Sequence, residues 1–64
     1  MVNAIPRKAD KGKTVRGFEY PRTGNGPVAG TFAGTWRTVN PGTYMARRVY
    51  ALIDGREVSD ARLA

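Results

Sequence analysis

Residues 28–39 restrict the fold of this chain more than any other feature of the sequence. The stretch is rich in threonine, valine and aromatic residues, and alanine is its only good helix former, a composition typical of a β-strand. Phe32 and Trp36 fall on the same strand face with a glycine between them. Because glycine inside a strand often marks a bend or a bulge, we expect this strand to curve strongly, as in a small barrel.

Turn-forming residues separate this strand from its neighbours. Residues 23–27 combine glycine and asparagine, which tolerate positive φ, with a proline that cannot donate to a strand ladder. Before this loop, the loose alternation over residues 14–22 predicts a strand that Pro21 ends. After residue 39, Asn40-Pro41-Gly42 predicts a type II turn, because proline presets φ and glycine supplies the positive φ that follows. A hairpin is therefore expected there.

The segment 43–53 is compatible with two structures. Its apolar residues match helical spacing and also fit the two faces of a strand, and they are Met45, Val49, Leu52 and Ile53. The Asp54-Gly55 pair suits a two-residue hairpin turn, and residues 56–58 beyond it resemble a returning strand. We therefore favour a strand over 43–53. The alternative is a helix at 43–53, which would give a small α+β domain.

The expected fold is mainly β, a curved four-strand meander that closes into an SH3-like or OB-like small barrel. Residues 59–64 are predicted to form one helical turn with Ser59 as its N-cap, or a tail. Residues 1–13 lack periodicity and have no obvious burial to offset the entropy of ordering, so we interpret them as a flexible basic arm. Residues 14–64 then form a single small β domain.

Positive charge is in excess and unevenly distributed. The chain has eleven lysines and arginines against five acidic residues, a net charge of +6. Residues 1–22 have six bases and two acids, residues 23–53 have three arginines and no acid, and residues 54–64 have three acids and two bases. Segregated charge of one sign creates a field that attracts a polyanion.

The residue types present exclude several classes of chemistry. Without cysteine or histidine the chain lacks disulfides, the usual zinc ligands and the base that would activate a serine nucleophile. The sequence therefore predicts no enzyme, no metal and no cofactor. A chain free of cysteine suits the reducing cytoplasm, and no apolar run approaches the roughly 18 residues of a membrane span. We expect a soluble cytoplasmic protein with no membrane partner.

Basic residues interleaved with aromatic ones are the candidate binding set. Arginine pairs with phosphate in a bidentate manner, and exposed rings can stack on bases. Aliphatic residues are scarce, however, so rings such as Trp36 are expected to be needed in the core, which leaves the bases as better candidates. The predicted nucleic-acid-binding residues are Arg7, Lys8, Lys11, Lys13, Arg16, Arg37, Arg47 and Arg48.

These features predict a small non-enzymatic binding protein that contacts the backbone of DNA or RNA through its arm and the arginines of its β surface. One alternative is a structural or assembly protein, such as a virion or ribonucleoprotein component, which could form homo-oligomers through unpaired strand edges. Another is a small inhibitor that binds the acidic surface of a protein. All three require a face on which the cations gather without carboxylate partners.

Overall fold

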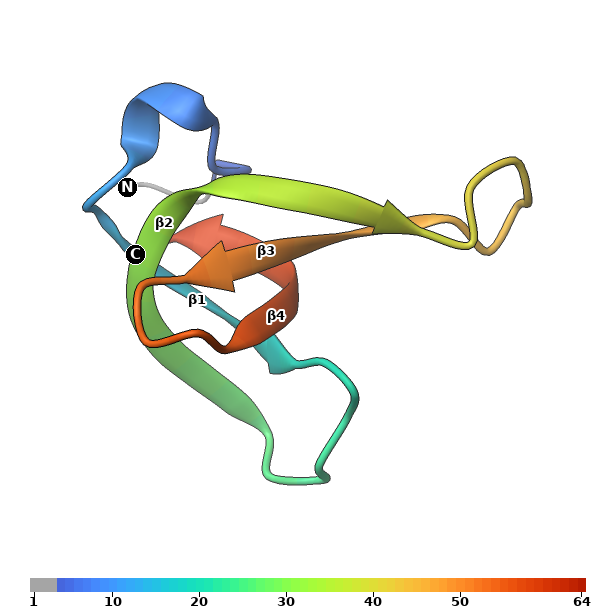
Figure 1. Ribbon diagram of the computed structural model, residues 1–64. Helices are drawn as coiled ribbons and strands as arrows, with labels where there is room; N and C mark the ends of the chain where they lie inside the picture. The colour runs from blue at the N-terminus through green and yellow to red at the C-terminus, as the bar shows by residue number, and fades with distance from the viewer. Residues whose placement is uncertain (1–3) are drawn as a thin grey trace.

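The computed structural model describes residues 4–64 and shows a closed antiparallel β-barrel (Figure 1). Its strands are β1 (Thr14–Glu19), β2 (Pro27–Val39), β3 (Arg47–Leu52) and β4 (Glu57–Leu63), preceded by the short 3-10 helix η1 (Lys8–Asp10). Each strand pairs with the next, and β4 returns to pair with β1. The predicted mainly β fold, a four-strand meander closed into a small barrel, is confirmed.

The long strand β2 belongs to both halves of the barrel. Residues 27–31 pair with β1, whereas Phe32 and residues 36–39 pair with β3. The register shifts between Phe32 and Trp36, where Gly34 has a φ of +89°. Glycine adopts this left-handed conformation without the steric cost that a Cβ imposes. The curvature predicted from the internal glycines is therefore present, and it lets one strand serve two partners.

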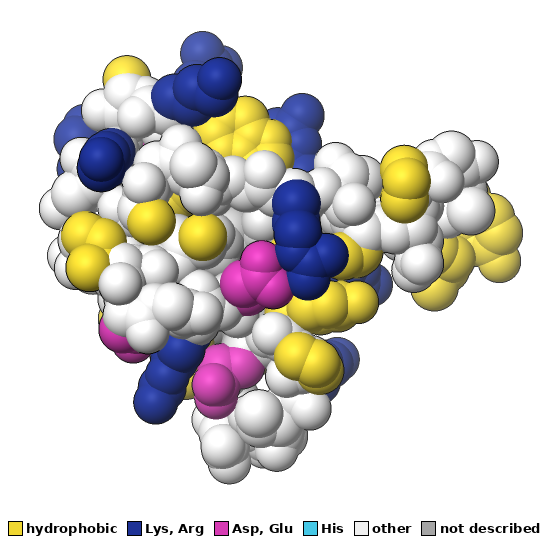
Figure 2. All heavy atoms as spheres, in the orientation of Figure 1, with side chains coloured by type: hydrophobic (Ala, Val, Ile, Leu, Met, Phe, Trp, Pro, Cys, Tyr) yellow, Lys and Arg dark blue, Asp and Glu magenta, His cyan; other side chains and the backbone are white. Residues whose placement is uncertain are grey.

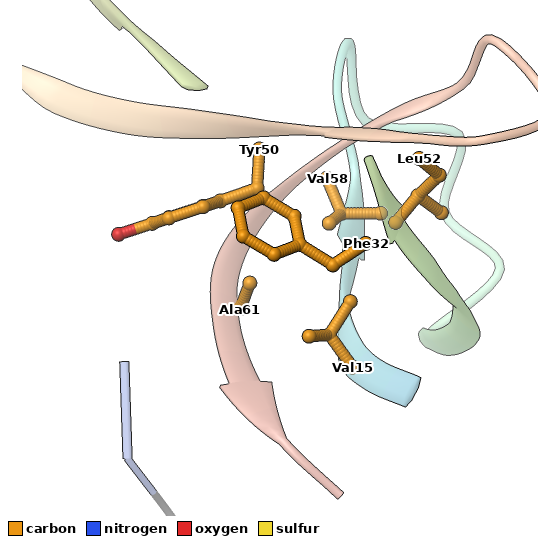
Figure 3. Packing of buried hydrophobic residues seen from close by; sticks show 6 residues of the cluster. All are labelled: Val15, Phe32, Tyr50, Leu52, Val58 and Ala61. Atoms are coloured by element: carbon orange, nitrogen blue, oxygen red, sulfur yellow. The ribbon is translucent and has the colours of Figure 1, made fainter. Parts of the chain in front are cut away.

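One cluster of side chains from all four strands fills the barrel (Figure 3). Its members are Val15, Phe32, Tyr50, Leu52, Val58 and Ala61. Phe32 is fully buried, and its ring and that of Tyr50 meet in a T-shaped arrangement with 5.8 Å between the ring centroids. Trp36 packs on the outside of the cluster and remains half-buried, with its centroid 6.4 Å from that of Phe32. Aromatic rings thus contribute much of the apolar packing in a core that has few aliphatic residues.

Strand β4 closes the barrel by close approach to β1. A Cβ at Gly17 would lie 2.7 Å from the carbonyl oxygen of Ser59, and a backbone atom cannot rotate away from that clash. The Ser59 hydroxyl is buried and donates to the carbonyl oxygen of Phe18 at 3.4 Å. The prediction of a helical turn or tail over residues 59–64 is wrong, because strand pairing with β1 continues to Leu63.

Strand β3 decides between the two structures predicted for residues 43–53. The strand begins at Arg47 and lies between β2 and β4, so the helical alternative is wrong. Residues 43–46 belong instead to the loop that joins β2 to β3. Pairing on both sides satisfies the backbone groups of β3 and buries Val49, an outcome that local periodicity could not reveal.

Both hairpin turns lie where the sequence places them. Gly42, in the first turn, has a φ of +81°, as the predicted turn requires. The second turn differs from the two-residue form expected for Asp54-Gly55. There the Leu52 N–H donates to the Arg56 carbonyl at 2.8 Å, which leaves residues 53–55 in the loop. Gly55 has a φ of +89°, and this left-handed conformation suits a three-residue hairpin loop.

Residues 4–13, the described part of the segment predicted as a flexible arm, lie against the barrel. Backbone hydrogen bonds join them to two strands, from the Gly12 N–H to the Phe32 carbonyl and from the Leu63 N–H to the Ala4 carbonyl. Pro6 is buried. The structure thus provides contacts that the sequence did not indicate, because both partners are distant along the chain. Residues 1–3 of the predicted arm lie outside the described residues.

Candidate functional site

Arginines from four separate segments meet on one part of the barrel surface. Two adjoining hollows share Ile5 and Arg48; Arg7 lines one of them, and Arg47 and Arg62 line the other. Arg16 of β1 lies directly opposite Arg62 in the pairing of β1 with β4, and both are exposed. We call this set the arginine surface, and its members are Arg7, Arg16, Arg47, Arg48 and Arg62.

The pairing of Arg16 with Arg62 places two like charges on neighbouring strands. Side chains directly opposite each other on one face lie close, and like charges there destabilise the sheet. No carboxylate among the described residues lies within 4.0 Å of a guanidinium nitrogen of the arginine surface. The Arg62 Nη1 donates to the Ala61 carbonyl at 2.9 Å, which leaves the other guanidinium donors available. An anion bound here would relieve the repulsion.

Arg48 is held by an aromatic ring. Its guanidinium carbon lies 5.7 Å from the ring centroid of Trp36, within the range of a cation–π contact. A guanidinium attracted to a ring face keeps N–H donors at its edge, so it can still bind a phosphate oxygen. The half-buried Trp36 therefore both extends the core and positions a cation of the arginine surface.

Two carboxylates lie at the border of the arginine surface. Asp10 accepts from the Arg7 backbone N–H at 2.8 Å and pairs with Lys13 at 3.2 Å. The hydrogen bond from Arg7, followed by that from Lys13, lowers the pKa of Asp10 below its ordinary value. Asp60 lines the hollow that contains Arg47 and Arg62 but makes no ion pair within 4.0 Å among residues 4–64. Positive charge exceeds negative charge across the whole surface.

The other acidic residues lie with cations of their own. Arg37 donates twice to Glu57, through Nε at 2.9 Å and Nη2 at 2.8 Å. This hydrogen-bonded pair lowers the pKa of Glu57 and raises that of Arg37. Arg56 lies 3.9 Å from Glu19 and 3.7 Å from Asp54. We call these five residues the salt-bridged face, and Figure 2 shows acidic and basic side chains side by side there.

The structure separates the eight predicted binding residues into three groups. Four belong to the arginine surface: Arg7, Arg16, Arg47 and Arg48. Arg37 lies in the salt-bridged face, and Lys13 pairs with Asp10, so both already have a carboxylate partner. Lys8 and Lys11 are exposed near η1, where the stem of Lys11 lies over Gly34.

Sequence reasoning missed Arg62. The residue lies in the segment 54–64, where acids outnumber bases, so the charge pattern pointed away from it. Only the register of β1 with β4 places it opposite Arg16. Correct recognition of residues 57–63 as a strand would have brought Arg62 to a barrel face, but its partner depends on pairing that no local pattern fixes.

Other features of the described chain bear on the kinds of site that it can contain. Residues 4–64 contain no group of three or more His, Cys, Asp or Glu placed to hold a metal ion. Across the same residues, no helix is long and apolar enough to cross a membrane. No protein-family model, curated protein or solved structure matches the chain. The arginine surface is therefore the basis on which a function is assigned.

Proposed function

We propose that this protein binds the phosphate backbone of nucleic acid through the arginine surface. The observation that supports the proposal is the convergence of five guanidinium groups from the N-terminal segment, β1, β3 and β4, none of which has a carboxylate partner within 4.0 Å among residues 4–64. Each guanidinium can form paired hydrogen bonds with phosphate oxygens, which are stronger than bonds between neutral groups. A row of phosphates would also offset the repulsion between Arg16 and Arg62.

The ligand is recognised mainly through its backbone. Residues 4–64 contain no α-helix that could enter a major groove, and the cations follow a curved barrel face. Binding of this kind depends on counterion release, so affinity falls steeply with salt. If all five arginines contact phosphates of a single strand, the slope of log K against log salt is about −3.5, from roughly 0.7 per phosphate.

Paired double variants test the proposal with equal changes in net charge. Arg47→Gln with Arg48→Gln removes two charges from the arginine surface, and Arg37→Gln with Arg56→Gln removes two from the salt-bridged face. Fluorescence anisotropy with labelled DNA and RNA oligonucleotides at several salt concentrations gives affinity and slope. We expect the first variant to bind at least tenfold more weakly and to lose about 1.4 from the slope, while the second binds like the native protein.

Two results would overturn the proposal. One is binding that is absent or insensitive to salt for the native protein with every DNA and RNA tested. The other is an equal loss of affinity in both double variants, because that would show a response to net charge rather than to a particular surface. Circular dichroism melting of each variant controls for loss of fold.

The structure weakens the support for the assembly alternative. That alternative relied on unpaired strand edges, but in the closed barrel β1 and β4 pair with each other. Roles as a virion component, a homo-oligomer or an inhibitor of an acidic protein stay predictions without a specific observation in their favour. The absence of cysteine supports a reducing compartment such as the cytoplasm as the place of action.

A further inference from the structure

The loop between β2 and β3, residues 40–46, projects from the barrel on a two-stranded ribbon (Figure 1). Tyr44 in this loop is 97% exposed, and Met45 beside it is 54% exposed. Figure 2 shows apolar side chains at the end of this projection, away from the barrel. In a chain with few large apolar residues, an aromatic ring placed wholly in water is an unusual use of one.

The backbone that holds Tyr44 is ordered by its own hydrogen bonds. The Thr43 hydroxyl donates to the Asn40 carbonyl at 2.9 Å and lies 3.2 Å from the Met45 N–H, which donates to it. The Ala46 N–H donates to the Thr43 carbonyl at 3.1 Å. A ring presented from a preorganised turn loses less conformational entropy when it meets a ligand.

The charge around the loop identifies the kind of ligand. Residues 23–53 contain no acidic residue, and Arg47, three positions after Tyr44, begins β3 opposite Val39. Arg47 and Arg48 belong to the arginine surface, and Arg47 lies at the end of the ribbon next to the loop, so a ligand that follows these cations passes close to the loop. The complementary partner carries repeated negative charge together with flat apolar faces. Nucleobases on a phosphate backbone have both properties.

We propose that Tyr44 stacks on an unpaired nucleobase and that single-stranded nucleic acid is the ligand class of the arginine surface. The inference rests on the proposed function and adds a second contact to it. A duplex hides the faces of its bases within its own stack, whereas a single strand exposes them. Stacking of one base on an aromatic side chain strengthens binding by about 5- to 150-fold.

The test compares bases with backbone at constant charge. The probes are a labelled oligothymidine of about 15 nucleotides, the same oligonucleotide with abasic sites, and the corresponding duplex. The proteins are the native chain, Tyr44→Ala and Tyr44→Phe. We expect Tyr44→Ala to bind the intact single strand at least fivefold more weakly, while Tyr44→Phe retains native affinity because its ring still stacks. On the abasic strand all three proteins should bind alike, with one salt slope.

The outcomes separate this inference from the proposed function. Equal, salt-dependent affinity of the native protein for intact and abasic strands would overturn the role of Tyr44 and leave backbone binding intact, as would preference for the duplex. No binding to any probe would overturn both. A Tyr44→Ala variant with native affinity for the intact strand but altered self-association would assign the loop to protein contact instead. Tyr44 lies outside the core, so melting should not change in any variant.

Discussion

The arginine surface and the salt-bridged face use the same side chain in opposite ways. On the salt-bridged face, Arg37 and Arg56 lie beside carboxylates, so their charge is compensated within the protein. On the arginine surface, Arg16 faces Arg62 across paired strands, and the charge remains available to a ligand. The comparison teaches that the count of arginines says little about binding. What matters is the residue that strand register places opposite each one.

The largest expected effect is loss of the fold itself, which would remove the arginine surface and the salt-bridged face together. Phe32 is fully buried at the centre of the core cluster, so Phe32→Ala should lower the free energy of unfolding by about 3–5 kcal/mol. A 64-residue domain has little stability to spare, so this variant should be largely unfolded at 37 °C. Urea denaturation followed by circular dichroism measures the change. A loss below about 1 kcal/mol would show that Phe32 is not the centre of the core.

Reversing one charge on each region should change stability in opposite directions. Arg16→Glu replaces a repulsive pair with an attractive one opposite Arg62, so stability should rise by about 0.2–1 kcal/mol. The same change removes one of the proposed phosphate contacts, so affinity for nucleic acid should fall. Arg37→Glu sets two carboxylates beside each other at Glu57, so its melting temperature should fall while its affinity changes little.

Thermal melting and binding measured on the same samples check the two reversals. The two changes in stability should have opposite signs. Arg16→Glu should gain stability and lose affinity, whereas Arg37→Glu should lose stability alone. If Arg16→Glu loses stability, the like-charged pairing with Arg62 is not a source of repulsion in solution. If both variants lose affinity equally, the two faces do not differ in function.

The smallest expected effect is a dependence of stability on pH. Arg37 lowers the pKa of Glu57 below 4.5, and the Arg7 N–H and Lys13 lower that of Asp10 below 3.8. Because these carboxyls bind protons less readily in the folded state, their contribution is present above those ordinary values and is lost as pH falls through the folded pKa values. The melting temperature should therefore decline as the pH is lowered from about 6 to about 2.5.

Glu57→Gln serves as the matched control for the pH series. The substitution removes the titrating group while keeping its size, so the decline in melting temperature at acid pH should become shallower. Arg37 supplies the largest shift of Glu57, so Arg37→Gln should flatten the same part of the curve. An unchanged acid profile in both variants would show that the pair between Arg37 and Glu57 does not persist in solution.

Local sequence determined the character of the elements in this protein. The composition of residues 28–39 specified a strand, and the glycines within it specified where the strand bends, since Gly34 takes a φ that other residues avoid. Asn40-Pro41-Gly42 likewise specified the turn between β2 and β3. The excess of cations was visible in composition alone. Each of these properties depends on a residue and its immediate neighbours.

Tertiary structure decided everything that requires a partner distant along the chain. Residues 59–63 lack a clear strand pattern, and they belong to β4 because β1 offers backbone groups to pair with. Residues 4–13 form backbone hydrogen bonds with strands far along the sequence. The partner of each arginine was also decided by tertiary structure, because Arg37 meets Glu57 and Arg16 meets Arg62 only in the register of the closed barrel. The number of charged side chains follows from the sequence, but the fold determines which of them are neutralised by a partner.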